Sequence, residues 1–277
     1  MSRILISDST SYLPENLINN YGIIIIPLYI HLEGKSYKEG RDISHAEFYH
    51  IFESSKMFPT TSQPSAGEFL EVFQSLAPED EALVILISAE LSGTVQSALM
   101  ARNMLENERQ KNIHIVDSRS SSMGMGFQLL KAGEMFTRGR TMTEVIEEVE
   151  RIKIQQEIYF IVDDLEYLVR GGRLSRSSGL IGNLLQLKPV LTLKDGKIEL
   201  FDKVRTSSRA IKLMMEQVEK NKSWLTQLAV IHIQAEEQAL KLQENLQEQY
   251  DITTVVSEAG PVIGSHTGPG TLGIAFC

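Results

Sequence analysis

A histidine near the C-terminus stands in an unusual setting. The last twenty residues, EAGPVIGSHTGPGTLGIAFC, place His266 among five glycines and two prolines, before a short apolar run. Glycine lets the backbone approach a ligand closely, and an imidazole can donate a hydrogen bond or a positive charge. The residues alone allow two interpretations: an ordinary turn before a last strand, or a histidine placed for chemistry.

The segment TTSQPSAGEF contains hydroxyl groups that local structure only partly explains. Ser65 stands three residues before Glu68, which predicts a capping box at the start of a helix, preceded by a loop. This explains Ser65 and leaves Thr61 and Ser62 without a structural role. Their hydroxyls are therefore candidate donors to a ligand.

A second hydroxyl-bearing turn, SAELSGTVQSA, lies between a predicted strand and a predicted helix. Ser92 could simply cap that helix. Alternatively, Ser92, Gly93 and the helix amino end could form an anion-binding turn, because free N–H groups and the helix dipole both favour negative charge.

Basic residues gather in one part of an otherwise acidic chain. Between Leu165 and Lys212 there are ten basic and four acidic residues, a local charge of +6. The basic residues are Arg170, Arg173, Arg176, Lys188, Lys194, Lys197, Lys203, Arg205, Arg209 and Lys212. This segment is either a solvated face or a surface for an anionic partner.

Several familiar catalytic motifs are missing from the sequence. Residues 268–273 match G-x-G-x-x-G, but only four residues follow, too few for the helix and acidic residue of a dinucleotide site. There is no phosphate-binding G-x-x-x-x-G-K-[ST] loop and no G-x-S-x-G nucleophile elbow, and the six histidines lack metal-ligand spacing. We expect no metal and no cofactor.

Composition limits the class of protein and its compartment. The 277 residues are 42% hydrophobic, as in soluble globular proteins, and the net charge of −9 argues against general nucleic-acid binding. No signal peptide or stretch of roughly 18 apolar residues is apparent. The single cysteine, Cys277, excludes an internal disulfide and suits a reducing compartment. We expect a cytoplasmic protein.

The hydrophobic pattern predicts the elements that position these residues. In the first half, the strands ILIS, IIIIPLYI, ALVILIS and IHIVDS alternate with helices at residues 44–52, 66–76, 94–107 and 123–137, which indicates a mostly parallel sheet with flanking helices. Several of these strands end in hydroxyl-rich turns, which should lie together at the carboxyl edge of the sheet.

The second half has an α+β pattern. A helix from about Met142 leads to the strand EIYFIVD, the turn VRGGRLS and a helical stretch around SSGLIGNLLQ. The strands KPVLTLK and KIELFDKVRT follow, joined by a hairpin at Asp195-Gly196, then helices at 208–220 and 236–249 alternate with the strands LAVIHIQ and ITTVVSE. We therefore predict two domains, residues 1–155 and 156–277.

Taken together, the motifs resemble the DegV family of fatty-acid-binding proteins, in order and over essentially the whole chain. They are SDSTS near the start, TSQPS at 61–65, LSGT at 91–94, VDS at 116–118, LVRGGR at 168–173, KP at Lys188 and IGSHTGPGTLG at 263–273. The resemblance implies a two-domain α/β fold with a lipid site between the domains, the second domain being related to the dihydroxyacetone-kinase substrate-binding fold.

The resemblance also implies a function and site residues. Such a protein holds a long-chain fatty acid while a separate ATP-dependent fatty acid kinase phosphorylates its carboxylate, and passes the acyl phosphate toward phospholipid synthesis through an acyltransferase or the membrane surface. It would be a carrier and not an enzyme. The implied carboxylate-binding residues are Thr61, Ser62, Ser92, Gly93, His266 and Thr267. Arg170, Arg173 and Arg205 would dock the kinase or stabilise charge.

Two other functions remain open at this stage. In an acyl hydrolase, Ser92 or Ser62 would be the nucleophile and His266 its base, but no residue that orients the histidine can be named. In a phosphotransferase subunit that binds a polyol, the pocket would be short and polar, whereas the segments LIGNLLQL and SMGMGFQLL are apolar.

Overall fold

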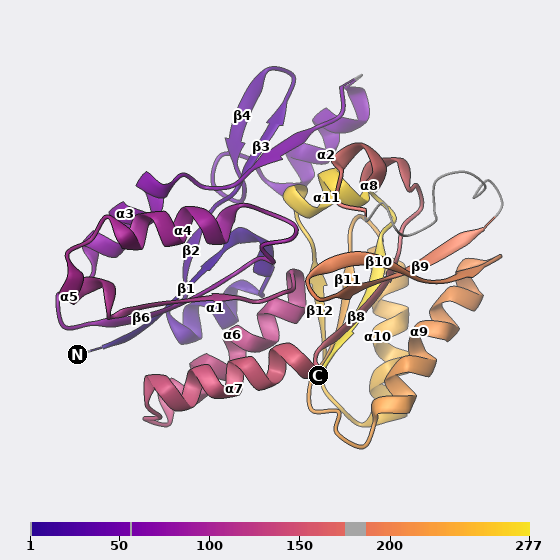
Figure 1. Ribbon diagram of the computed structural model, residues 1–277. Helices are drawn as coiled ribbons and strands as arrows, with labels where there is room; N and C mark the ends of the chain where they lie inside the picture. Colours follow the sequence, from indigo (N-terminus) through magenta and orange to yellow (C-terminus); the bar gives the residue numbers. More distant parts are fainter. Residues whose placement is uncertain (1, 56, 175–186) are drawn as a thin grey trace. The chain divides into compact units, whose positions relative to one another are not determined.

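The computed structural model describes residues 2–55, 57–174 and 187–277 (Figure 1). Contacts between residues divide the chain into two compact units, Met1–Ile154 and Gln155–Cys277. The predicted helical stretch around SSGLIGNLLQ and the basic residue Arg176 lie largely or wholly outside the described residues.

Unit 1 is built on a four-stranded parallel sheet in the order β2-β1-β6-β7. Its strands are β1 (Arg3–Asp8), β2 (Ile24–Ile26), β6 (Glu81–Leu86) and β7 (Ile113–Asp117). The residues of β6 from Ala82 onward are buried, as expected for a strand with both faces covered. The predicted parallel sheet is confirmed.

Helices cover both faces of this sheet, as is usual for parallel strands. They are α1 (Glu15–Tyr21), α3 (Ala66–Ser75), α4 (Thr94–Asn103), α5 (Asn107–Gln110), α6 (Ser122–Thr137) and α7 (Met142–Gln155), with a 3₁₀ turn, η1 (Ser9–Ser11), after β1. α3 packs on α4, and its Phe69 and Phe73 are fully buried against Val84 and Leu86 of β6. α3 begins with the predicted capping box of Ser65 and Glu68.

A second, smaller sheet in unit 1 is antiparallel, in the order β4-β3-β5. It contains β3 (Tyr29–Leu32), β4 (Lys35–Lys38) and β5 (Thr60–Ser62), and α2 (His45–Ser54) lies between β4 and β5 in the chain (Figure 1). The sequence predicted one strand over IIIIPLYI and a loop at TTSQPS. Both predictions were wrong: the first run is divided at Pro27, whose ring removes a backbone donor, and the second contains β5.

Unit 2 is built on a six-stranded mixed sheet in the order β10-β9-β8-β13-β11-β12. Its strands are β8 (Glu157–Ile161), β9 (Lys188–Lys194), β10 (Lys197–Val204), β11 (Leu228–His232), β12 (Thr254–Glu258) and β13 (Leu272–Phe276). The hairpin between β9 and β10 is confirmed, and Asp195 and Gly196 have φ values of 49° and 80°, as a two-residue hairpin turn requires.

The last strand of the chain lies inside this sheet. β13 pairs antiparallel with both β8 and β11. After it, the carbonyl oxygen of Cys277 accepts hydrogen bonds from the backbone N–H groups of Thr226 (2.7 Å) and Gln227 (3.0 Å). The C-terminal segment is therefore a central part of the core of unit 2.

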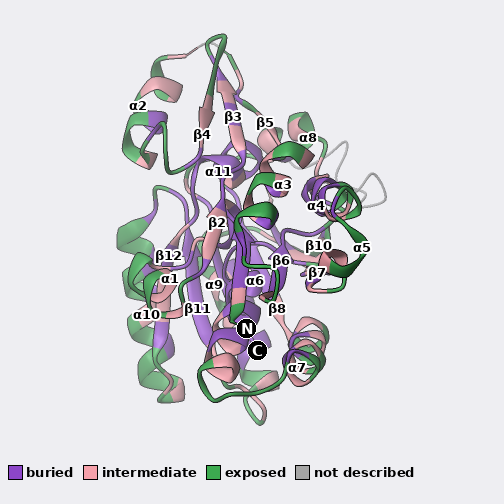
Figure 2. Cartoon of the chain, turned by 90° about the vertical axis from the view of Figure 1, so that its left-hand side faces the viewer, coloured by how far each residue is buried: buried purple, intermediate pink, exposed green. Residues whose placement is uncertain are grey.

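The helices of unit 2 are α8 (Glu166–Gly171), α9 (Ser207–Asn221), α10 (Glu236–Tyr250) and α11 (Pro261–Thr267). α9 and α10 contribute Leu213, Met214, Leu242 and Leu246 to the hydrophobic core of this unit. In Figure 2, β11 is buried while α10 has an exposed outer side.

Other predicted elements differ from the structure at glycines and helix ends. The helix predicted over 94–107 ends at Asn103, and α5 follows it. The turn predicted at VRGGRLS begins inside α8, which ends only at Gly171, with Gly172 in the left-handed conformation as its cap. Among the described residues, no helix is long and apolar enough to cross a membrane.

From the central position of β13 we predict that its side chains contribute strongly to the free energy of unfolding. Phe276 is fully buried and packs against Tyr159 and Trp224 at centroid distances of 6.2 and 6.1 Å. Phe276→Ala should lower the free energy of unfolding by about 3–5 kcal/mol, through lost burial and the cavity left behind. Urea unfolding followed by the fluorescence of Trp224, the single tryptophan, measures the change.

The matched control is Phe201→Ala. Phe201 also contacts Tyr159, at 4.8 Å, but it is 38% exposed. This change should cost about 1 kcal/mol. Equal losses in the two variants would contradict a central role for β13.

Candidate functional site

Thr61 and Ser62 lie on β5 and point to opposite faces of the small sheet, because successive side chains alternate along a strand. Thr61 is paired with the buried Ile30 of β3. On the other face, the Ser62 hydroxyl is 2.9 Å from Nε2 of His31. The two hydroxyls therefore cannot act from the same side of the strand.

Ser92 and Gly93 lie at the amino end of α4. Gly93, not Ser92, is the N-cap residue, and no side chain caps the helix. The Ser92 hydroxyl is instead 2.8 Å from Oγ1 of Thr94. The helix end thus keeps N–H groups that its own side chains do not cap, which is the arrangement that favours an anion.

Gln63 brings the TSQPS and LSGT motifs together. A Cβ atom at Gly93 would lie 2.7 Å from the Nε2 atom of Gln63, so the amide of Gln63 lies directly against the backbone of Gly93. Gln63 directly follows Ser62. Thr61, Ser62, Ser92 and Gly93 are therefore grouped within unit 1.

A buried carboxylate holds the start of the Ser92 turn. Asp8, at the end of β1, accepts hydrogen bonds from the backbone N–H groups of Ile87 (2.8 Å) and Thr10 (2.9 Å) and from the Thr10 hydroxyl (2.5 Å). Burial raises its pKa, although these donors act in the opposite direction. Ser88 directly follows Ile87. Its carbonyl oxygen accepts hydrogen bonds from the backbone N–H groups of Leu91 and Ser92, both at 3.0 Å. In the sequence, only the SDSTS motif indicates Asp8, and it predicts no structural role for this residue.

In unit 2, His266 lies in the last turn of α11 and is buried. The ring packs on the backbone of α8: a Cβ atom at Gly171 would be 2.3 Å from its Nδ1 atom. Burial, and then the positive charge of Arg173, lower the pKa of His266 to about 4. At neutral pH this histidine is uncharged and can donate one N–H bond but no positive charge.

Arg173 is the arginine of the LVRGGR motif that acts on His266. It is half-buried, and its Nη1 atom donates to the carbonyl oxygen of Gly171 at 2.6 Å. Burial lowers its pKa, yet a guanidinium stays charged at neutral pH. A fixed cation therefore lies near a neutral imidazole.

The other two candidate arginines are exposed. Arg170 forms an ion pair along α8 with Glu166 at 2.5 Å. Arg205 was predicted within a strand, but it lies in a bend after the end of β10 at Val204. Lys188 pairs with Asp163 at 2.9 Å. Two of the basic residues in this segment are thus compensated by nearby carboxylates.

The residues after His266 have local roles. The Thr267 hydroxyl donates to the carbonyl oxygen of Ile263 at 3.2 Å. Gly268 and Gly270 have φ values of 78° and 79°, and Cβ atoms there would overlap Tyr167 and Asp163. These two glycines are explained by backbone conformation and packing. The helix that carries His266 was missed by the sequence analysis, which expected a glycine-rich turn.

The surroundings of His266 differ from those of the histidine in a serine hydrolase. In a serine hydrolase, a carboxylate orients the histidine. The charged group that shifts the pKa of His266 in the described part of the chain is a cation, Arg173. The described residues also contain no group of three or more histidine, cysteine or carboxylate side chains that could hold a metal ion.

Comparison with known proteins identifies similar sequences and structures. Residues 4–277 match the family model described as an uncharacterised protein of the DegV family. A DegV domain-containing protein of Caldanaerobacter subterraneus subsp. tengcongensis is 38% identical over 276 residues, covering 98% of this chain and 97% of the relative.

Two solved structures are similar over the full length. One is a DegV family protein of Thermus thermophilus described by its fatty acid binding, with a TM-score of 0.91 and 34% identity, covering 100% of this chain and 99% of that chain. The other is DegV of Bacillus subtilis, described as a fatty acid binding protein, with a TM-score of 0.89, 35% identity and the same coverage.

The buried imidazole predicts a pH effect on stability. Because the pKa of His266 in the folded chain, about 4, lies below the ordinary value of 6.5, its neutral form stabilises the fold above pH 6.5. This contribution, about 3 kcal/mol, should be lost as the pH falls from 6.5 through 4. Urea unfolding of the parent and of His266→Gln across this range should show a smaller pH-dependent loss in the variant.

The control for this measurement is His50→Gln, at an exposed position of α2. It should follow the parent at every pH. If His266→Gln also followed the parent, the buried, neutral state assigned to His266 would be wrong.

Proposed function

The chain belongs to the DegV family, and from that premise we propose that it binds a long-chain fatty acid. The observation that carries this proposal is the full-length similarity, at 34–35% identity, to proteins described as binding fatty acids. The buried neutral donor His266 and the uncapped start of α4 add support, because both suit an anion.

The carboxylate is the demanding end of this ligand. An ionised carboxylate without donors costs several kcal/mol to bury. We assign it to the hydroxyls of Thr61 and Ser92, the backbone at Gly93, and the imidazole N–H of His266. Ser62 and Thr267 were predicted as further donors. Their hydroxyls form hydrogen bonds with the imidazole of His31 and the carbonyl oxygen of Ile263. They would therefore bind the carboxylate through their backbone N–H groups, or after these hydroxyl hydrogen bonds are broken.

The acyl chain would supply most of the favourable free energy. Each buried methylene contributes about 0.8 kcal/mol, so a long chain brings on the order of 10 kcal/mol before the cost of association. This exceeds the cost of desolvating a carboxylate that has several donors. A short polyol has few methylene groups to bury and would gain little of this free energy.

A finer proposal concerns the chemistry after binding. We propose that the protein is a cytoplasmic carrier without catalytic activity of its own, which presents the carboxylate to a separate fatty acid kinase. The acyl phosphate would then pass to an acyltransferase or the membrane surface for phospholipid synthesis. Exposed Arg170 and Arg205 are our candidates for kinase docking, and half-buried Arg173 is our candidate for stabilising the added negative charge.

The first experiment is native mass spectrometry of the purified protein, followed by solvent extraction and identification of released molecules. A stoichiometric mass that matches a long-chain fatty acid supports binding and names the preferred chain. A protein that is empty and does not take up added oleate or palmitate would contradict the proposal. It would redirect attention to ester hydrolysis and polyol binding.

Single substitutions test the carboxylate-binding residues. Thr61→Val, Ser92→Ala and His266→Ala should each weaken fatty acid binding about tenfold, since each removes a hydrogen bond to a charged group. Displacement of a fluorescent fatty acid measures the affinity, and thermal unfolding verifies the fold. Thr60→Val is the control, because Thr60 is exposed on the opposite face of β5 and should bind like the parent. Three variants with parental affinity would show that these residues do not bind the carboxylate.

A second substitution separates kinase docking from lipid binding. Arg170→Ala should keep parental fatty acid affinity and slow acyl phosphate formation by a kinase catalytic subunit about tenfold. Its control is Arg140→Ala, since Arg140 is also exposed and pairs with a glutamate four residues away, at 3.1 Å. If both variants supported the parental rate, Arg170 would have no part in docking.

A further inference from the structure

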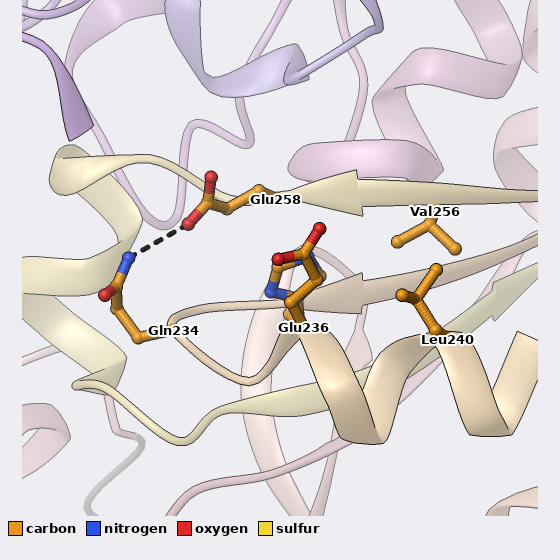
Figure 3. A pocket seen from close by; sticks show the side chains of 6 residues that line it. Gln234, Glu236, Leu240, Val256 and Glu258 are labelled. Carbon is orange, nitrogen blue, oxygen red and sulfur yellow. Dashed lines mark hydrogen bonds between the residues drawn. The ribbon is translucent and has the colours of Figure 1, made fainter. Parts of the chain in front are cut away.

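Unit 2 contains a pocket that the fatty acid proposal does not use. It has a volume of about 570 Å³ and lies where β11 and β12 end and α10 begins (Figure 3). The residues that line it are His232, Gln234, Glu236, Leu240, Val256 and Glu258. β11 and β12 are parallel neighbours joined by α10, and the carboxyl ends of such strands are common ligand-binding positions.

The buried group of this pocket is His232, which is only 5% exposed. Its Nδ1 atom accepts a hydrogen bond from the backbone N–H of Ala235 at 3.5 Å. Burial lowers its pKa, which favours the neutral ring. Because Nδ1 accepts the N–H of Ala235, the neutral ring carries its proton on Nε2. No described residue forms a hydrogen bond with Nε2. The pocket therefore contains one buried N–H donor that could bind an acceptor on a ligand.

Two carboxylates surround this donor. Glu258 is paired with His232 in the register of β11 and β12, and Glu236 is the first residue of α10. Both raise the pKa of His232, which places their charges close to the ring. Gln234 donates to Oε1 of Glu258 at 3.0 Å, the dashed line in Figure 3, which orients that carboxylate. Glu236 forms no ion pair with any described residue. The lining thus has a charge of −2.

An apolar wall completes the pocket. Leu240 lies one turn after Glu236 on α10 and is 44% exposed, although leucine is usually buried. Val256 lies two residues before Glu258 on the same face of β12, and Figure 3 shows it facing Leu240. A ligand here would therefore contact carbon as well as charge. This mixture does not suit a metal ion, and the described residues contain no metal-binding group.

From this arrangement we infer that the pocket binds a small amino alcohol, a primary ammonium ion with a neighbouring hydroxyl group. The ammonium group would donate to the carboxylates of Glu236 and Glu258, and the hydroxyl oxygen would accept from Nε2 of His232. The methylene groups between them would contact Leu240 and Val256. A phosphorylated amino alcohol, as in a lipid headgroup, would place a third negative charge beside the two glutamates and is disfavoured.

A ligand series with the unaltered protein tests this inference. The imidazole signals of His232 are followed by nuclear magnetic resonance during titration, after assignment by loss of the signals in His232→Gln. Ethanolamine should shift them in a saturable way. Ethylamine, which lacks the acceptor, and ethylene glycol, which lacks the charge, should bind at least about tenfold more weakly. O-Phosphoethanolamine should be weaker than ethanolamine.

Substitutions identify the carboxylates. Glu236→Gln and Glu258→Gln should each weaken ethanolamine binding about tenfold or more, since a charge-assisted hydrogen bond is lost. The matched control is Glu237→Gln, which removes the same charge from the same exposed turn of α10 at a residue that does not line the pocket. It should bind like the parent. Thermal unfolding establishes that each variant is folded.

Specific results would overturn the inference. Unchanged His232 signals with ethanolamine would show that the pocket takes no amino alcohol. If ethylamine bound as tightly as ethanolamine, the hydroxyl group would not be recognised. If Glu237→Gln weakened ethanolamine binding as much as Glu236→Gln and Glu258→Gln, the attraction would be a general effect of negative charge and not of a defined site. Tighter binding of O-phosphoethanolamine would identify a lipid headgroup or phosphate ester as the ligand. Fatty acid binding is independent of all these outcomes.

Discussion

The antiparallel pairing of β13 with β8 and β11 is the constraint on which unit 2 depends. It joins strands that are far apart in the sequence and places the last residues of the chain in the centre of a sheet. The segment between β12 and β13 must therefore return across the sheet in a short connection, and α11 provides it. The position of His266 follows from this connection, because α11 packs on α8 and presses the imidazole against Gly171.

Some of this arrangement can be predicted from the sequence and some cannot. The Asp195-Gly196 hairpin and the Ser65–Glu68 capping box are local, so a few residues determine them, and both are confirmed. The strand β5 and the helix α11 depend on partners distant in sequence. Hydrophobic periodicity and secondary-structure propensity cannot reveal such partners. The glycines around His266 favoured a turn over a helix in the sequence-based prediction.

The candidate site shows the same distinction at the level of side chains. The motifs singled out His266 and Ser92 as residues that bind a carboxylate, and this role stays a prediction. They could not reveal that Thr61 and Ser62 lie on opposite faces, which requires knowledge of the strand. Nor could they reveal Asp8, whose role depends on Ile87, 79 residues away.

The neutral state of His266 has a consequence for any anionic ligand. Burial and Arg173 both favour the uncharged ring, whereas a bound carboxylate would favour the charged ring. Ligand binding and protonation of His266 are thus linked, and each must raise the affinity for the other. Before binding, the positive charge available near the ring is that of Arg173, which is half-buried and held by the carbonyl of Gly171. Arg170, already paired with Glu166, has less to offer an anion. Among the arginines of the LVRGGR motif, Arg173 is therefore better suited to stabilise additional negative charge at a carboxylate.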